Sequence, residues 1–150
     1  MVQEGKPAPD FELASDTGER VRLSDLRGRT VVLYFYPKDD TPGCTTQACG
    51  LRDVYSEIQE RGATVLGVSP DTEASHVKFR DKYGLPFALL ADPEHEVAEL
   101  YDVWVEKNAY GKKSMGIKRS TFVIDDAGNV VKAMRGVSPD GHADKVLTEL

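Results

Sequence analysis

The two cysteines of the chain, Cys44 and Cys49, are the residues best suited to carry chemistry. Cys44 follows a loop, residues 37–43, which joins a predicted buried strand to a predicted helix. Sites in α/β proteins gather at this edge of the sheet. At the first turn of the helix, unpaired backbone N–H groups and the positive end of the helix dipole favour the thiolate over the thiol. The position therefore predicts a nucleophilic sulfur at Cys44.

The residues that precede Cys44 suit attack on an O–O bond. Prolines and a glycine keep the loop rigid and let a small substrate approach the backbone closely. The hydroxyl of Thr41 can donate and accept hydrogen bonds, so it could hold a peroxide oxygen against the sulfur. From the residues alone, Cys44 could also be an inert buried thiol, Thr41 only a helix cap, and Pro37 only the end of a strand.

Pro37, Thr41 and Cys44 match the peroxiredoxin pattern of proline, three residues, threonine or serine, two residues, cysteine. The surrounding segment, FYPKDDTPGCTTQAC, resembles the bacterioferritin comigratory protein (peroxiredoxin Q) subfamily in particular. The resemblance extends over most of the chain, from residues 9–11 to a late hairpin. It implies a thiol peroxidase that acts on hydrogen peroxide and organic hydroperoxides.

The resemblance also implies a role for each site residue. Cys44 is then the peroxidatic cysteine, Thr41 positions the peroxide and Pro37 shields the pocket from water. The family has an essential arginine at the start of a later strand, and Arg119 fits that place. A guanidinium there would stabilise the thiolate and the charge on the leaving oxygen. The alternative for Arg119 is a surface arginine beside Lys118.

Cys49 is implied by the resemblance to resolve the oxidised Cys44 through an intramolecular disulfide, although it could be a bystander. On an uninterrupted helix, residues five apart lie about 140° apart around the axis, with Cα atoms roughly 8.7 Å apart. A disulfide needs about 4.4–6.8 Å. If both cysteines lie on the helix, its first turns must unwind before the disulfide forms. The resemblance implies a monomer that is recycled by thioredoxin or a similar dithiol reductant.

An alternation of strand-like and helix-like segments must position these residues. Residues 30–36 are apolar without alternation, as in a strand buried on both faces of a sheet. We expect an α/β, thioredoxin-like fold with a mixed central sheet flanked by helices and an N-terminal β-hairpin. The expected hairpins cover residues 11–23 and 120–134, the further strands 63–68 and 87–90, the helices 44–61, 72–83, 94–101 and a C-terminal segment, and a solvated loop 106–118.

Length and composition bound the remaining choices. A chain of 150 residues with 40% hydrophobic content fits one domain, residues 1–150. The net charge of −6 and the absence of a basic cluster disfavour nucleic-acid binding. The longest apolar run, residues 31–36, is far shorter than the ~20 residues that span a bilayer, so we expect no membrane partner. Without an export signal, we expect a cytoplasmic protein.

The other titratable residues predict no second site. The histidines, His76, His95 and His142, lack the usual zinc spacing with the cysteines, so we expect surface histidines, no metal and no cofactor. Asp39 and Asp40 are expected in turn or solvent roles.

Two competing functions remain at this stage. A thiol–disulfide oxidoreductase on the same fold would generally carry Cys-x-x-Cys, which is absent. The other is a binding module in which the two cysteines form a permanent structural bridge. Such a bridge is incompatible with the helix 44–61, which the spacing of apolar residues along one helix face predicts.

Overall fold

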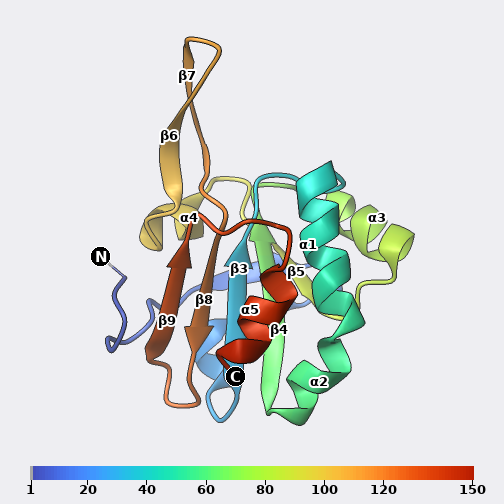
Figure 1. Ribbon diagram of the computed structural model, residues 1–150, viewed down its shortest axis with the longest axis vertical. Coiled ribbons are helices and arrows are strands. Elements are labelled where there is room, and N and C mark those ends of the chain that lie inside the picture. Colours follow the sequence, from blue (N-terminus) through green and yellow to red (C-terminus); the bar gives the residue numbers. More distant parts are fainter. Residues whose placement is uncertain (1) are drawn as a thin grey trace.

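The computed structural model describes residues 2–150, without the side chain of residue 109. Its centre is a seven-stranded sheet with strand order β2-β1-β5-β4-β3-β8-β9, and a separate hairpin, β6-β7, projects beyond it (Figure 1). Within residues 2–150, no helix combines the length and apolar character needed to cross a membrane. In chain order the elements are β1 (Glu12–Ser15), β2 (Arg20–Arg22), the 3-10 helix η1 (Leu23–Leu26), β3 (Thr30–Phe35), α1 (Pro42–Asp53), α2 (Tyr55–Glu60), β4 (Ala63–Ser69), α3 (Glu73–Tyr83), β5 (Ala88–Ala91), α4 (Glu96–Leu100), β6 (Trp104–Ala109), β7 (Lys112–Ile117), β8 (Ser120–Ile124), β9 (Val130–Arg135) and α5 (His142–Thr148).

Strand β3 lies in the interior of the sheet, between β4 and β8. It runs parallel to β4 and antiparallel to β8. Its side chains alternate between two cores, with Val31, Leu33 and Phe35 in one and Val32 and Tyr34 in the other. Because both faces of the strand are covered, every residue after Thr30 is apolar or aromatic. The predicted buried strand is confirmed.

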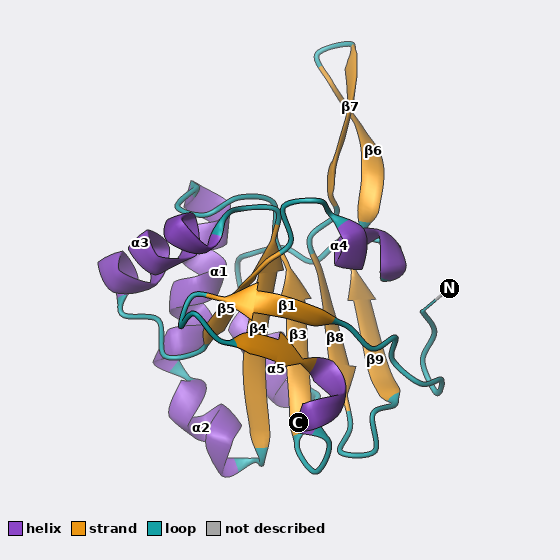
Figure 2. Cartoon of the chain, turned by 180° about the vertical axis from the view of Figure 1, so that it is seen from behind, coloured by secondary structure: helices purple, strands orange, loops and turns teal. Residues whose placement is uncertain are grey.

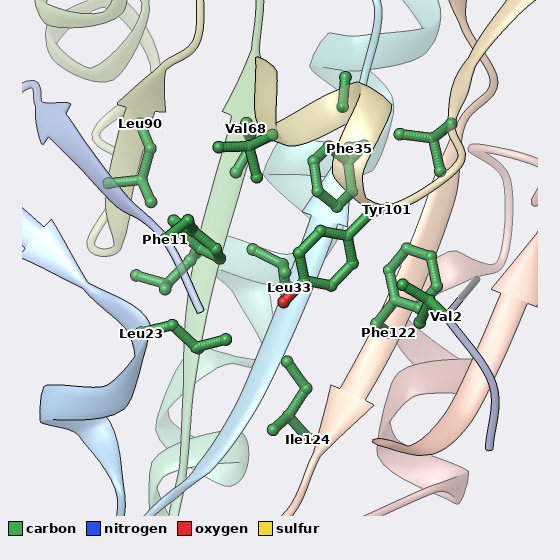
Figure 3. Packing of buried hydrophobic residues seen from close by; sticks show 14 of the residues in the cluster. Val2, Phe11, Leu23, Leu33, Phe35, Val68, Leu90, Tyr101, Phe122 and Ile124 are labelled. Atoms are coloured by element: carbon green, nitrogen blue, oxygen red, sulfur yellow. The ribbon is translucent and has the colours of Figure 1, made fainter. Parts of the chain in front are cut away.

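The first core lies between the sheet and the N-terminal segment. The ring of Tyr101 packs 5.4 Å from that of Phe35 and 5.3 Å from that of Phe122, measured between centroids (Figure 3). Phe11 meets the same tyrosine edge-on at 6.0 Å. Strands β1 and β2 run across this side of the sheet (Figure 2). The predicted N-terminal hairpin therefore closes one face of the fold.

The second core lies between the sheet and the helices α1, α2, α3 and α5. Its buried members include Leu51 of α1, Ile58 of α2, Phe79 of α3 and Val146 of α5. Cys44 belongs to this core as well. The candidate site is thus built on the helical face of the sheet.

Two segments differ from their predicted form. Residues 106–118 make the β6-β7 hairpin instead of a solvated loop, because Tyr110 and Gly111 adopt the positive φ values, 54° and 77°, of a two-residue hairpin turn. The helix predicted from Cys44 to residue 61 is interrupted at Val54, which leaves the helical region. Valine is β-branched and loses side-chain freedom in a helix, so it is a favourable place for the break.

His142, predicted on the surface, is 1% exposed at the start of α5. Its Nε2 lies 2.7 Å from Oγ1 of Thr121, which ties the helix to β8. Burial and, to a smaller extent, the positive charges of Arg119 and Lys145 together lower the pKa of His142 to about 4. The surface prediction failed because the partner hydroxyl comes from a strand that sequence spacing does not connect to α5.

This pKa predicts that the fold loses stability in acid. The unfolded chain binds a proton on His142 near a pH of about 6.5, and the folded chain only near 4, so stability falls as the pH decreases through that window. The loss from this group is about 3 kcal/mol. Urea unfolding at pH 7 and pH 4.5 should show a smaller difference for His142→Asn than for wild type. Equal differences would contradict the assignment.

Candidate active site

The N-terminus of α1 holds Cys44 in its first turn, as predicted. Thr41 takes the N-cap position with an extended backbone, φ −95° and ψ 156°, and Pro42 is the first helical residue. Proline is well tolerated there, since that N–H has no partner within the helix. The Cys44 side chain is 1% exposed and lies over the sheet. The sulfur is therefore buried at the first turn of a helix, where backbone N–H groups have no partners within the helix.

Arg119 lies between β7 and β8, 75 residues after Cys44 in the sequence, and its side chain contacts Cys44. Its Nη2 donates to Cys44 Sγ at 3.4 Å. Its Nη1 donates to Oε1 of Gln47 at 2.6 Å. A guanidinium at this distance stabilises a negative charge on the sulfur. The structure thus places the predicted arginine against the predicted nucleophile.

Gly43 makes this approach possible. A β-carbon at this position would lie 3.1 Å from Nη2 of Arg119 and 3.4 Å from Cγ of Pro139. The separation from Arg119 is tighter than ordinary van der Waals contact, and the one from Pro139 is at its lower limit. The glycine before the cysteine therefore leaves room for the guanidinium.

Gln47 is a site residue that the sequence reasoning missed. It is fully buried one turn after Cys44, and its Nε2 has no hydrogen-bond partner among the described residues. Its Oε1 fixes the orientation of the Arg119 guanidinium. A polar residue three positions after the cysteine, on the same helix face, was the available signal.

Thr41 and Pro37 lie on the loop that leads into α1. The Thr41 side chain does not cap the helix; its Oγ1 donates to the carbonyl of Lys38 at 2.8 Å. Because the hydroxyl hydrogen is used in this way, its lone pairs are left to accept a hydrogen bond. Pro37 is half-buried and opens the loop directly after the buried Tyr36. The structure brings Arg119 into contact with Cys44 and keeps Thr41 and Pro37 on the adjoining loop.

Cys49 lies on the same helix as Cys44, and both thiols are free. Helix α1 is continuous from Pro42 to Asp53, so the helical geometry keeps the two Cα atoms roughly 8.7 Å apart. That separation exceeds the reach of a disulfide.

Strand β6 adds a second cation to the electrostatic surroundings of the site. Burial lowers the pKa of Lys107, the positive charge of Arg119 lowers it further, and Cys44 opposes these effects. Lys107 of the projecting hairpin therefore lies within electrostatic range of Arg119 and Cys44.

Comparisons with known proteins identify the family. The AhpC/TSA family model matches residues 4–133. Peroxiredoxin Bcp of Bacillus subtilis is 50% identical over 149 residues, which cover 99% of this chain and 95% of the relative. The chain belongs to the peroxiredoxin family. Its predicted membership of the Bcp group is confirmed, and this peroxiredoxin is a thiol peroxidase that uses a peroxide and a reductant.

Further relatives support the same identification. Peroxiredoxin Bcp of Escherichia coli is 43% identical, over 99% of this peroxiredoxin and 96% of the relative. A solved structure of the bacterioferritin comigratory protein of Xanthomonas campestris has a TM-score of 0.92 and 40% identity, over 98% and 96% of the two chains. A solved structure of a cysteine-to-serine mutant of Xylella fastidiosa PrxQ has a TM-score of 0.94 and 35% identity, over 99% and 95%. The predicted thioredoxin-like fold is confirmed.

Because Arg119 contacts two groups with two nitrogens, we predict that its positive charge alone does not sustain the rate of Cys44 oxidation. Arg119→Lys keeps the charge but replaces the planar guanidinium, whose two nitrogens contact Gln47 and the Cys44 sulfur separately, with a single ammonium nitrogen. The second-order rate constant for oxidation of Cys44 by hydrogen peroxide should fall about 10²-fold. Stopped-flow measurement at neutral pH checks this, and a rate within about threefold of wild type would contradict it.

Proposed function

We propose that this peroxiredoxin reduces hydrogen peroxide and organic hydroperoxides with Cys44 as the attacking group. The observation that carries the proposal is the contact between the Arg119 guanidinium and the buried sulfur at the helix N-terminus. The thiolate attacks one peroxide oxygen, an S–O bond forms as the O–O bond breaks, and Cys44 becomes a sulfenic acid. The other oxygen leaves with the electron pair of the O–O bond and takes up a proton, giving water or an alcohol.

The neighbouring residues support the attack in distinct ways. Thr41 accepts a hydrogen bond from the peroxide O–H, since its own hydrogen is donated to Lys38. Arg119 stabilises the charge that develops on the leaving oxygen, and Gln47 holds it in place. Pro37 shields the sulfur from bulk water at the start of the loop.

Cys49 completes the cycle by attacking the sulfur of the sulfenic acid. An S–S bond forms, and the hydroxyl of the sulfenic acid leaves as water after taking up a proton. Because an intact α1 keeps the two cysteines apart, its first turns unwind for this step.

The reductant that reopens the disulfide is thioredoxin or a similar dithiol protein. In the proposed cycle, the peroxiredoxin acts as a monomer, because the resolving thiol comes from the same chain. Its proposed location is the cytoplasm. The net charge of −6 supports the absence of a nucleic-acid partner. The Xanthomonas campestris relative was described with alkyl peroxide reduction activity, which supports organic hydroperoxides as substrates here.

Counting thiols after a peroxide pulse tests these roles. Wild type should lose both thiols and about 2 Da, because a disulfide removes two hydrogens. Cys49→Ser should instead accumulate adducts of about 16 Da per oxygen, because the sulfenic acid cannot be resolved. Cys44→Ser should stay inert. Intact-mass spectrometry checks all three, and a Cys44→Ser variant that reacts as fast as wild type would overturn the proposal.

A further inference from the structure

Asp39, predicted in a turn or solvent role, is instead the centre of a buried polar network. Its Oδ1 accepts a hydrogen bond from the Tyr36 hydroxyl at 2.5 Å. Its Oδ2 accepts one from Oγ of Ser75 at 2.8 Å and lies 2.7 Å from Nδ1 of His76. Tyr36 lies directly before the catalytic loop, whereas Ser75 and His76 belong to α3. The carboxylate therefore fastens the loop to that helix.

His76 has an oxygen partner at each ring nitrogen. Its Nε2 lies 2.9 Å from the carbonyl oxygen of Leu90, which can only accept. Its Nδ1 faces Oδ2 of Asp39, and that carboxylate already accepts the hydroxyl hydrogens of Tyr36 and Ser75. Both ring nitrogens thus face oxygen atoms that can accept a hydrogen bond. The predicted surface histidine is fully buried and lies against a carboxylate.

The peptide group between Lys38 and Asp39 connects this network to the site. Its N–H, from Asp39, donates to Oδ2 of Asp71 at 2.8 Å. Asp71 is held in turn by Oγ of Ser69 at 2.6 Å. The C=O of the same peptide, from Lys38, accepts the hydroxyl hydrogen of Thr41. Since the peptide group is planar, fixing its N–H also fixes the direction of its C=O.

The same cluster contains atoms of the kind that bind metal ions. One such atom from each of Asp39, Asp71 and His76 lies within 4.8 Å of the other two. Hydrogen bonds account for this closeness, because each of the facing atoms already has a partner. The cluster is therefore explained as a positioning network.

We propose that His76, Asp39 and Asp71 are positioning residues for Thr41. A buried ion pair between His76 and Asp39, together with Asp71, holds the Lys38–Asp39 peptide plane, so that the Thr41 hydrogen stays on Lys38 and its lone pairs stay turned toward the peroxide. This inference rests on the proposed peroxide-holding role of Thr41. It extends the site to α3, whose residues lie more than 30 positions from the loop in sequence.

The protonation of His76 can be read from its ring nitrogens by ¹⁵N NMR at pH 7. His76 should give two protonated nitrogens. His142, whose pKa is lowered to about 4 by burial, should give a neutral ring in the same spectrum and serves as the internal reference. A neutral His76 ring would overturn the ion pair.

A double-mutant cycle tests whether His76 acts through Thr41. The quantity measured is the rate constant for oxidation of Cys44 by hydrogen peroxide. Thr41→Val should lower it about 10²-fold, and His76→Gln about tenfold. If the two residues act through one hydrogen bond, the double variant should be no slower than Thr41→Val alone. Effects that multiply, or a His76→Gln rate equal to wild type, would overturn the inference.

The two proposals fail in distinguishable ways. A Thr41→Val variant as fast as wild type would remove the peroxide-holding role of Thr41, and the inference with it. A slow Thr41→Val with a fast His76→Gln would overturn the inference alone.

Asp16→Asn is the matched control. Asp16 is a second buried carboxylate bound to α3, through Nη1 of Arg80 at 2.9 Å, one turn after His76. Its loss should destabilise the protein and leave the rate of peroxide oxidation unchanged, whereas a slower rate would show that general destabilisation explains His76→Gln.

If His76→Gln does not fold, Ser75→Ala removes one donor to Asp39 and should lower the rate about threefold. An unchanged rate in that variant would count against the inference.

Discussion

The contact between Arg119 and Cys44 exists only while the first turns of α1 are folded. Cys44 and Gln47 lie one helical turn apart, and the guanidinium, 75 and 72 residues away in sequence, contacts both. The same turns keep Cys49 beyond disulfide distance. The arrangement that places the guanidinium against the sulfur therefore also keeps the second thiol out of reach. In the proposed cycle, the helix stays folded for the first chemical step and opens for the second.

The two sides of Cys44 differ in how firmly they are held. Before it, the loop is fastened to α3 by the buried Asp39 and by the exposed Asp40, which contacts Lys82 and Tyr83. After it, α1 runs for only 12 residues before Val54 interrupts it. A short helix with an interruption at its far end costs little to unwind compared with a loop anchored by buried hydrogen bonds. The proposed cycle therefore places the conformational change in α1 and not in the loop.

The sequence predicted the place of the candidate reacting residues better than the residues that support them. The spacing of Pro37, Thr41 and Cys44, with Arg119 from the resemblance, pointed to residues that the fold brings to the end of α1 and its adjoining loop. Uninterrupted apolar runs predicted the interior strands. Gln47, Asp39 and His76 were missed or placed at the surface because a buried polar group needs partners, and the partners of these residues come from other elements. The carbonyl of Leu90 and the guanidinium of Arg119 come together with them only in the fold. The local sequence around a residue does not indicate which distant residue will be its hydrogen-bond partner.

Hydrogen exchange of the α1 amides, residues 44–52, in the reduced and the peroxide-oxidised protein tests the central claim most directly. In the reduced protein these amides should be protected by the intact helix, and in the disulfide form they should exchange at least about tenfold faster. The amides of β3 should keep their protection in both states, since the sheet does not take part. Equal protection of α1 before and after oxidation would contradict the account, because the disulfide would then form on an intact helix.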